Sequence, residues 1–310
     1  MTDKPQILRS AKLFDKSNGE LADRFNVGLL TEDQAETARL LDGIGPSVRG
    51  IAVRKTVIDR AMIDRLPALE IISSYSAGTE NIDTAYAREK DIKVANTSHI
   101  LAGEVANLAL AQILSLTRNL VNADAFVRAG KWAHETFPLT HSLKGMKIGI
   151  VGFGHIGSEI ARRLDAMGAE PAYSGPNRKP VDYAYHETPL DLAQETQMLV
   201  VTCPLTSQTR GMIDAQVMAA IGEDGYLVNV ARGPIVDERA LIELLARNGL
   251  AGAALDVFED EPNVPIELIK DRRVILTPHM ASGTHETREF MGDAMVDALI
   301  ETLGGEPIKR

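Results

Sequence analysis

Three apolar segments in the second half of the chain each lead directly to a side chain that can bind or transfer charge. Arg232 closes the first, Glu261 follows the second, and His279 comes just after the third. An arginine can hold a carboxylate through two hydrogen bonds, and a histidine can transfer a proton near neutral pH. A neighbouring glutamate would stabilise the protonated imidazole and orient it. Taken singly, these residues are equally well explained as a strand-end charge, a loop acid and a core histidine.

A glycine-rich turn joins a strand candidate, 147–151, to an amphipathic helix candidate, 156–167. Its spacing, Gly-x-Gly-x-x-Gly, suits a tight turn, then close approach of a pyrophosphate, then close packing of helix on strand. The free N–H groups and the dipole of the helix start favour phosphates. Strand, turn and helix in this order favour dinucleotide binding over a turn without a ligand. The contacts expected here are Gly152, Gly154, His155, Ile156 and Gly157.

The nucleotide turn and the three charged side chains together suggest one reaction. Reducing a 2-oxo acid requires a cation for its carboxylate, a proton donor for its carbonyl oxygen and a hydride donor held against one face. Arg232, His279 and a nicotinamide would supply one each, with Glu261 in an orienting role.

The end of the second strand of this fold normally carries an acid that binds the adenosine ribose. Here the sequence has no carboxylate and two cations instead, Arg178 and Lys179. A 2′-phosphate would be bound by them, with help from Ser174 and Asn177. We therefore predict that NADPH is preferred over NADH. The alternative is an ordinary basic surface turn.

Short β-rich runs alternate with helix-like stretches along most of the chain, which predicts α/β architecture with parallel sheets. In the first part, strands are expected at 7–11, 27–30, 50–53, 69–73 and 93–95, with helices at 33–41 and 57–66. Leu101–Leu120 is predicted to be one long, largely buried helix. Six strands are expected in the second part, at 147–151, 171–174, 198–202, 226–230, 253–257 and 274–277, followed by a helix at 284–303.

Composition limits the class of protein. The formal net charge of -10 opposes general binding to nucleic acid or to an anionic membrane. The single cysteine, Cys203, cannot form an internal disulfide or a multi-cysteine metal site, so no metal is expected and a reducing compartment is favoured. Without a leader pattern or about 18 uninterrupted apolar residues, a cytoplasmic location is expected.

Four motifs resemble, in order, the signature blocks of the D-isomer-specific 2-hydroxyacid dehydrogenases. They are Gly152-x-Gly154-x-x-Gly157, Val228-Asn-Val-Ala-Arg232-Gly, Asp256-Val-Phe-x-x-Glu261-Pro262 and Thr277-Pro-His279. The resemblance implies that Arg232, Glu261 and His279 are the catalytic residues and that Asp256 lies near the nicotinamide carboxamide. It also implies that the backbone N–H groups of Ser76, Ala77 and Gly78 bind the substrate carboxylate, as Arg232 and His279 also contact the substrate. Further cofactor contacts are expected at Cys203, Pro204, Thr209, Val230, Ala231, Ser282 and Gly283.

The family organisation implies two Rossmann-like or flavodoxin-like parallel-sheet domains with an active-site cleft between them. Residues 1–99 plus 284–310 would form the substrate domain, and 100–283 the dinucleotide-binding domain. A homodimer is expected, with the 101–120 helix and the 130–143 loop as interface candidates. The closest resemblance is to the glyoxylate/hydroxypyruvate reductase and hydroxyphenylpyruvate reductase branch, in which a tryptophan of the partner subunit approaches the substrate. Trp132 would take that place, or serve only as an interface anchor.

Other interpretations remain open at this stage. Without the resemblance, the loop around Ser76 would be a strand-to-helix connection with Asp83 as a helix cap. The chain could also be a non-enzymatic, nucleotide-sensing corepressor-like protein, or a phosphoglycerate dehydrogenase. The sequence does not rank glyoxylate, hydroxypyruvate and aryl pyruvates as substrates.

Overall fold

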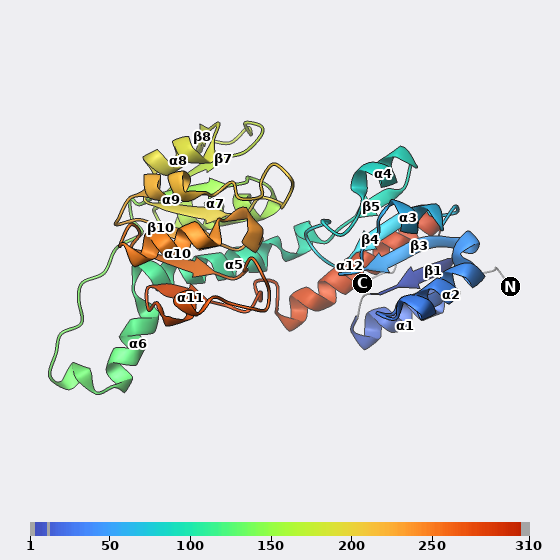
Figure 1. Cartoon of the computed structure of the whole chain (residues 1–310), viewed down its shortest axis with the longest axis horizontal. Coiled ribbons are helices and arrows are strands. Elements are labelled where there is room, and N and C mark those ends of the chain that lie inside the picture. Colours follow the sequence, from blue (N-terminus) through green and yellow to red (C-terminus); the bar gives the residue numbers. More distant parts are fainter. Residues whose placement is uncertain (1–3, 11–12, 305–310) are drawn as a thin grey trace. The chain divides into compact units, whose positions relative to one another are not determined.

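The computed structural model describes residues 4–10 and 13–304. The chain divides into two compact units (Figure 1): the first comprises Met1–Leu101 and Gly283–Arg310, and the second comprises Ala102–Ser282. The predicted strand end at Ala11 and residues 1–3 and 305–310 of the predicted substrate domain lie outside the described residues.

The first unit contains a five-stranded parallel sheet. Its strand order, β2-β1-β3-β4-β5, is the flavodoxin-like order. The strands are β1 (Gln6–Arg9), β2 (Asn26–Leu29), β3 (Val48–Val53), β4 (Ile71–Ser74) and β5 (Lys93–Ala95). The helices of this unit are α1 (Asp15–Arg24), α2 (Gln34–Ile44), α3 (Arg60–Asp64), α4 (Thr84–Glu89) and α12 (His285–Leu303), with a 3-10 turn, η1 (Gly45–Ser47). The late helix α12 returns to pack against β3, β4 and α1 (Figure 1), so both ends of the chain build this unit.

The second unit contains a seven-stranded parallel sheet with the order β12-β11-β10-β9-β6-β7-β8. The strands are β6 (Lys147–Val151), β7 (Glu170–Ser174), β8 (Ala184–His186), β9 (Met198–Val201), β10 (Tyr226–Asn229), β11 (Gly252–Leu255) and β12 (Val274–Leu276). The strand order reverses between β6 and β9, which is where doubly wound sheets bind ligands. The predicted fold class, two parallel-sheet α/β domains, is confirmed.

The helices of the second unit cover this sheet and extend beyond it. They are α5 (Ser98–Thr117), which begins in the first unit, α6 (Leu120–Arg128), α7 (His155–Ala166), α8 (Pro189–Glu195), α9 (Ala215–Ile221), α10 (Glu238–Ala246) and α11 (Ile266–Lys270), with 3-10 turns η2 (Lys131–Ala133) and η3 (Gly233–Ile235). Helix α7 buries Gly157, Ile160, Ala161 and Leu164, one face of a helix with the expected period.

The long helix predicted over 101–120 is confirmed as far as Thr117, and only its end was wrong. Helix α5 ends at Thr117, and Asn119, with a φ of 49°, adopts the left-handed conformation before α6 begins. Asparagine tolerates that conformation better than most residues.

Two other predictions also need correction. The second sheet has seven strands rather than six, because β8 is a three-residue edge strand without an apolar run. The helix expected at 57–66 is only α3, which starts after its cap, Asp59; the carboxylate of Asp59 accepts a hydrogen bond from the Met62 N–H.

Helix α5 is long and apolar enough to cross a membrane by length and composition alone. Half of that window is buried, however, and Val105, Ala109 and Ile113 are each at most 4% exposed. A core helix of a globular unit meets the same criterion, and the burial of these residues accounts for the apolar sequence of α5.

Candidate active site

The loop that carries His279 is held by a buried carboxylate. Asp256, directly after β11, is fully buried and accepts hydrogen bonds from the Thr277 hydroxyl (2.6 Å), the Met280 N–H (2.9 Å) and the Ala281 N–H (3.0 Å). The Thr277 hydroxyl also accepts one from the Gln112 side chain at 3.0 Å. These bonds fix the loop from both ends of the turn.

His279 itself has an unusual backbone. Its φ is 49°, a conformation that costs a non-glycine residue roughly 1–3 kcal/mol and persists only where the surroundings impose it. The His279 N–H donates to the carbonyls of Asp256 (2.8 Å) and Thr277 (3.0 Å), which holds the residue in this conformation. The turn therefore holds His279 just beyond the carboxyl end of β12.

The imidazole of His279 contacts Glu261. His279 Nδ1 lies 2.7 Å from Glu261 Oε2, and the second carboxylate oxygen accepts a hydrogen bond from the Phe258 N–H at 3.3 Å. The two side chains are 47% and 35% exposed, so the pair is open to solvent and ligands. With a carboxylate at Nδ1, that nitrogen carries the hydrogen, and Nε2 is left for a ligand.

Arg232 follows β10, and a buried asparagine fixes its backbone. The Asn229 amide donates to the Arg232 carbonyl at 3.1 Å and accepts from the Ala231 N–H at 3.0 Å. At Gly233, a Cβ would come within 1.9 Å of the Phe258 backbone, so this turn packs directly on the segment leading to Glu261. The guanidinium donates one hydrogen bond to the Ala231 carbonyl at 2.7 Å.

The glycine-rich turn has the geometry of a ligand cradle. Gly152 has a φ of 94°, and a Cβ there would lie 2.6 Å from the Cys203 nitrogen; a Cβ on Gly157 would lie 2.2 Å from the Gly152 carbonyl oxygen. A Cβ on Gly154, in contrast, would meet nothing within 4 Å. Gly154 is the N-cap of α7, no side chain caps that end, and His155 and Ile156 begin the helix. The open space in front of uncapped helix N–H groups fits a dinucleotide pyrophosphate.

The end of β7 presents cations around a buried hydroxyl. Ser174 is 1% exposed, and its Oγ has no hydrogen-bond partner among the described residues. Asn177, Arg178 and Lys179 are exposed in the loop that follows. The Lys179 N–H donates to the Tyr173 hydroxyl at 2.7 Å, which fixes the loop backbone while leaving the Lys179 side chain in solvent.

The remaining residues expected at the cofactor follow β9, β10 and β12. Cys203 is 8% exposed, and burial raises the pKa of its thiol to about 11. The Thr209 hydroxyl donates to the Pro204 carbonyl at 2.7 Å, so this side chain shapes its own loop. Val230 and Ala231 are buried beyond β10, and Ser282 and Gly283 stand at the boundary between the two units.

The loop after β4 contains backbone N–H groups that donate no hydrogen bond within the described residues. The N–H groups of Ser76, Ala77 and Gly78 donate no hydrogen bond to any residue within 4–10 and 13–304. The Ser76 hydroxyl donates to the Gly78 carbonyl at 2.5 Å, which tightens the loop. Asp83 caps α4 by accepting from the Tyr86 N–H, as the interpretation without the family expects. The cap and the free N–H groups occupy different parts of one connection, so the two interpretations are compatible.

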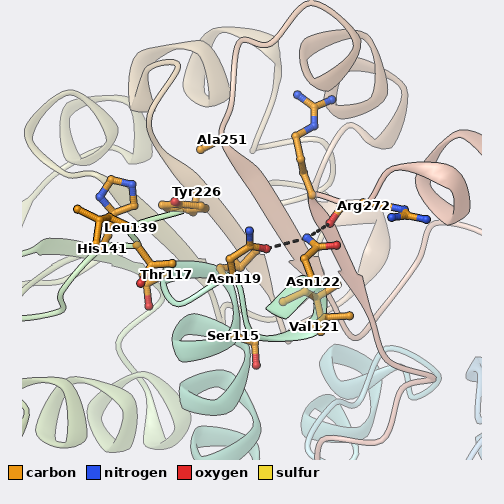
Figure 2. A pocket seen from close by; sticks show the side chains of 14 residues that line it. Ser115, Thr117, Asn119, Val121, Asn122, Leu139, His141, Tyr226, Ala251 and Arg272 are labelled. Atoms are coloured by element: carbon orange, nitrogen blue, oxygen red, sulfur yellow. Dashed lines mark hydrogen bonds between the residues drawn. The ribbon is translucent and has the colours of Figure 1, made fainter. Parts of the chain in front are cut away.

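A separate pocket of about 190 Å³ is a poor candidate for the active site (Figure 2). It is lined by the end of α5 and by residues at or just before the start of three strands, Tyr226, Ala251 and Arg272. In Figure 2 the Asn122 amide bridges Asn119 and the Arg272 carbonyl. Parallel sheets bind ligands at the carboxyl ends of their strands, and this pocket lies at the amino ends.

Sequence reasoning missed several polar residues that hold the predicted site segments in place. Asn229, Gln112 and Thr202 are polar residues within or at the end of apolar segments, and each forms hydrogen bonds to a predicted site segment. A polar side chain in an otherwise buried strand or helix was the signal that could have identified them.

Comparisons with known proteins agree with this geometry. The family model described as D-isomer specific 2-hydroxyacid dehydrogenase, NAD binding domain, matches residues 110–281. Glyoxylate/hydroxypyruvate reductase A of Arabidopsis thaliana is 44% identical over 304 residues, 97% of each chain. Hydroxyphenylpyruvate reductase of Plectranthus scutellarioides is 41% identical over 251 residues, covering 81% of this chain and 80% of the relative.

A solved structure resembles both units. The NADPH-dependent glyoxylate/hydroxypyruvate reductase of Sinorhizobium meliloti, in complex with NADP and malonate, has a TM-score of 0.87 and 36% identity, and the match covers 97% of this chain and 94% of that one. The chain therefore belongs to the D-isomer-specific 2-hydroxyacid dehydrogenase family. It is an oxidoreductase that uses a pyridine nucleotide to reduce 2-oxo acids.

Proposed function

We propose that this enzyme reduces glyoxylate and hydroxypyruvate to their 2-hydroxy acids with NADPH, using Arg232, Glu261 and His279. The observation that carries the proposal is the 2.7 Å contact between His279 Nδ1 and Glu261 Oε2, on a loop that Asp256 holds in place. The substrate choice is supported by the full-length similarity to the Arabidopsis thaliana reductase.

In this mechanism His279 is the proton donor. Glu261 accepts a hydrogen bond from Nδ1–H and stabilises the protonated ring, so Nε2 carries the proton that moves to the carbonyl oxygen. The neutral ring that remains keeps its hydrogen on Nδ1, and solvent restores the proton on Nε2. When bound, the nicotinamide supplies the hydride for the carbonyl carbon.

Two groups are suited to the substrate carboxylate. Arg232 presents a guanidinium that can bind it through two hydrogen bonds. The N–H groups of Ser76, Ala77 and Gly78 form a second set of donors without partners among the residues that the structure describes. Binding through both would hold the carbonyl in one orientation, which is the main requirement for stereospecific reduction.

The preference for NADPH rests on the loop after β7. Ser174 offers a buried Oγ, and Arg178 and Lys179 form no ion pair with any other described residue. A 2′-phosphate would give these cations a partner, and Asn177 adds a neutral donor. The same lack of a carboxylate at this strand end disfavours NADH, which needs an acceptor for its ribose hydroxyls. The nearby turn residues Gly152, Gly154 and Gly157 would hold the pyrophosphate.

The homodimer is supported by exposed apolar side chains of the second unit. Helix α6 has no buried residue, and Figure 1 shows it projecting from the sheet of that unit. In and after it, Val127 is 53%, Trp132 71% and Leu139 102% exposed. A partner subunit would cover this surface, and sedimentation analysis of the wild type and a Trp132→Ala variant tests it.

Cytoplasmic location remains part of the proposal, supported by the unpaired Cys203. The relatives reported above are named as reductases, and they give no support to a corepressor-like protein or a phosphoglycerate dehydrogenase.

The test of the proposed function is initial-rate oxidation of NADPH and of NADH with glyoxylate, hydroxypyruvate, phenylpyruvate and 4-hydroxyphenylpyruvate. We expect kcat/KM with NADPH to exceed that with NADH by about tenfold or more, because charge-assisted contacts to the phosphate are lost. Faster turnover of an aryl pyruvate than of glyoxylate and hydroxypyruvate would overturn the substrate assignment. Equal efficiency with both cofactors would overturn the cofactor preference.

A further inference from the structure

One glutamine interrupts the apolar face that helix α5 turns to the core. Gln112 is 2% exposed, and its neighbours Ala109 and Ile113 are fully buried. An apolar side chain at this position would lose no hydrogen bonds to water on burial, whereas an amide must replace them within the protein. The amide of Gln112 therefore needs a partner inside the core.

The partner of Gln112 belongs to the segment that carries His279. Gln112 Nε2 lies 3.0 Å from Thr277 Oγ1, and Thr277 Oγ1 lies 2.6 Å from Asp256 Oδ1. The Thr277 hydroxyl has a single hydrogen, and the Asp256 carboxylate takes it, because an ionised carboxylate can only accept. Gln112 must therefore present its NH₂ group to Thr277. The hydrogen bonds run in one direction, from amide to hydroxyl to carboxylate.

These hydrogen bonds end on the carboxylate that holds the backbone of the His279 loop. Asp256 is fully buried, accepts hydrogen bonds from the Met280 and Ala281 N–H groups, and forms no ion pair with a cation of the described residues. A buried carboxylate without a cation depends on its hydrogen bonds alone. Consecutive hydrogen bonds polarise one another, so a donor to Thr277 strengthens the bond from Thr277 to Asp256.

Helix α5 gives this series of hydrogen bonds a rigid origin. The polypeptide enters the second unit within this helix, at Ala102, and leaves the unit after Ser282, three residues beyond His279. The bond from Gln112 to Thr277 thus joins, inside the second unit, the helix by which the chain enters to the segment by which it leaves. A side chain on a core helix has few alternative positions, so it holds the loop against a fixed reference.

We propose that Gln112 is a positioning residue for the reduction, which holds His279 in its reactive orientation through Thr277 and Asp256. This inference rests on the proposed role of His279 as the proton donor. The Oε1 atom of Gln112 is buried and has no partner among the described residues, which lowers the stability of the fold. The contribution of Gln112 is therefore expected in the rate of reduction and not in the free energy of unfolding.

The central test replaces Gln112 by methionine, which has a similar length, suits a helix and has no amide. In Gln112→Met we expect kcat with glyoxylate and NADPH to fall about 3- to 10-fold, the kinetic equivalent of one neutral hydrogen bond. KM for glyoxylate should change little, because the groups proposed for its carboxylate are untouched. The urea midpoint should stay equal or rise, since an unsatisfied buried carbonyl is removed. A purely structural residue would give the opposite result, a lower midpoint with an unchanged kcat.

A second set of variants tests the route through Thr277. Thr277→Val removes the hydroxyl with little change of shape, and kcat should fall about 10- to 100-fold because a hydrogen bond to a carboxylate is lost. Thr277→Ser keeps the hydroxyl and should recover most of that loss. In Thr277→Val the Gln112 amide has lost its acceptor. Adding Gln112→Met to Thr277→Val should therefore raise the urea midpoint and lower kcat no further.

Thr117→Val is the matched control, and amide hydrogen exchange is a measurement without turnover. Thr117 is also a buried polar residue of α5, but its hydroxyl bonds to the Ile113 and Leu114 carbonyls of the same helix. Its loss should leave kcat unchanged. Mass spectrometry should find faster exchange in peptides with residues 279–282 of Gln112→Met, and unchanged exchange in those with β6, because only the loop is loosened.

The possible failures are distinct. Near-normal kcat in His279→Ala would refute the proposed role of that histidine, on which this inference depends. A large loss in His279→Ala together with a wild-type kcat in Gln112→Met would refute the inference alone. Additive losses of kcat in the double variant of Gln112 and Thr277 would also refute it, because Gln112 would then act by another route. A lower urea midpoint in Gln112→Met would assign the amide to stability instead.

Discussion

The two units differ in whether their charged side chains have partners of opposite charge. In the second unit, His279 contacts Glu261, and its loop is held by the buried Asp256. In the first unit, Arg54 and Arg288 have no acidic partner among the described residues. Proton transfer requires an imidazole whose orientation and tautomer are fixed before the substrate arrives. Binding of an anion instead requires donors that the protein itself does not satisfy, such as the N–H groups of Ser76, Ala77 and Gly78 proposed for the substrate carboxylate.

The largest effect should come from removing the proton donor. We expect His279→Ala to lower kcat by ~10²–10⁴, the usual range for a general acid–base residue, with an unchanged Kd for NADPH. Steady-state rates and nucleotide binding by fluorescence measure the two quantities. His186→Ala, in β8 of the same unit, is the control histidine and should retain full activity. Near-normal kcat in His279→Ala would mean that the pair with Glu261 is structural only.

A second test asks whether the carboxylate that holds the loop is as important as we infer. In Asp256→Asn, at least one of the bonds from Met280 and Ala281 faces an NH₂ group instead of an oxygen. Leaving one buried donor unsatisfied costs about 1–3 kcal/mol in the free energy of unfolding, and kcat should fall because His279 loses its fixed position. Urea denaturation and steady-state rates check both. Asp224→Asn, on an exposed turn, is the control; if Asp256→Asn matched it in both measurements, the loop would not depend on this carboxylate.

The cations after β7 extend the comparison into the second unit, because they too have no acidic partner among the described residues. Replacing both Arg178 and Lys179 by alanine should raise KM for NADPH by about 10- to 100-fold and leave KM for NADH nearly unchanged. The Lys144→Ala variant removes another exposed cation of this unit and should change neither. A parallel rise of KM for both nucleotides would show that the loop binds a part common to them.

The sequence predicted the bounds of some strands correctly and those of other elements less well. The bounds of β5 and β6 agree with the expected 93–95 and 147–151; each strand begins at a lysine and ends directly before Asn96 or Gly152. The break at Asn119 was not predicted, because the apolar residues Leu120 and Val121 follow it directly and resemble a continuation of the helix. The edge strand β8 is half-exposed and carries no pattern of its own.

For the candidate site, the sequence indicated which side chains could act, but not the hydrogen bonds that hold them in place. Arg232, Glu261 and His279 follow apolar strands, so their location at one sheet edge could be inferred from topology. The bonds from Thr277, Met280 and Ala281 to one carboxylate depend on a loop that folds back over its neighbour, which no local pattern encodes. The hydrogen bond from the Tyr75 hydroxyl to the Arg288 carbonyl likewise depends on the return of α12 to the first sheet.

The smallest expected effect concerns Cys203, a residue of the second unit that is buried without a charged partner. Burial raises the pKa of its thiol to about 11, so the reactive thiolate forms only as the pH rises towards that value. At about pH 8 the thiolate fraction should be only ~10⁻³, and alkylation by iodoacetamide should be slow and should accelerate through pH 9 and 10 without a plateau. Mass spectrometry of the native protein measures the rate, and the urea-unfolded protein provides the fast control. Alkylation of the native thiol as fast as in the unfolded chain would mean that the turn at Gly152, which packs against Cys203, opens readily in solution.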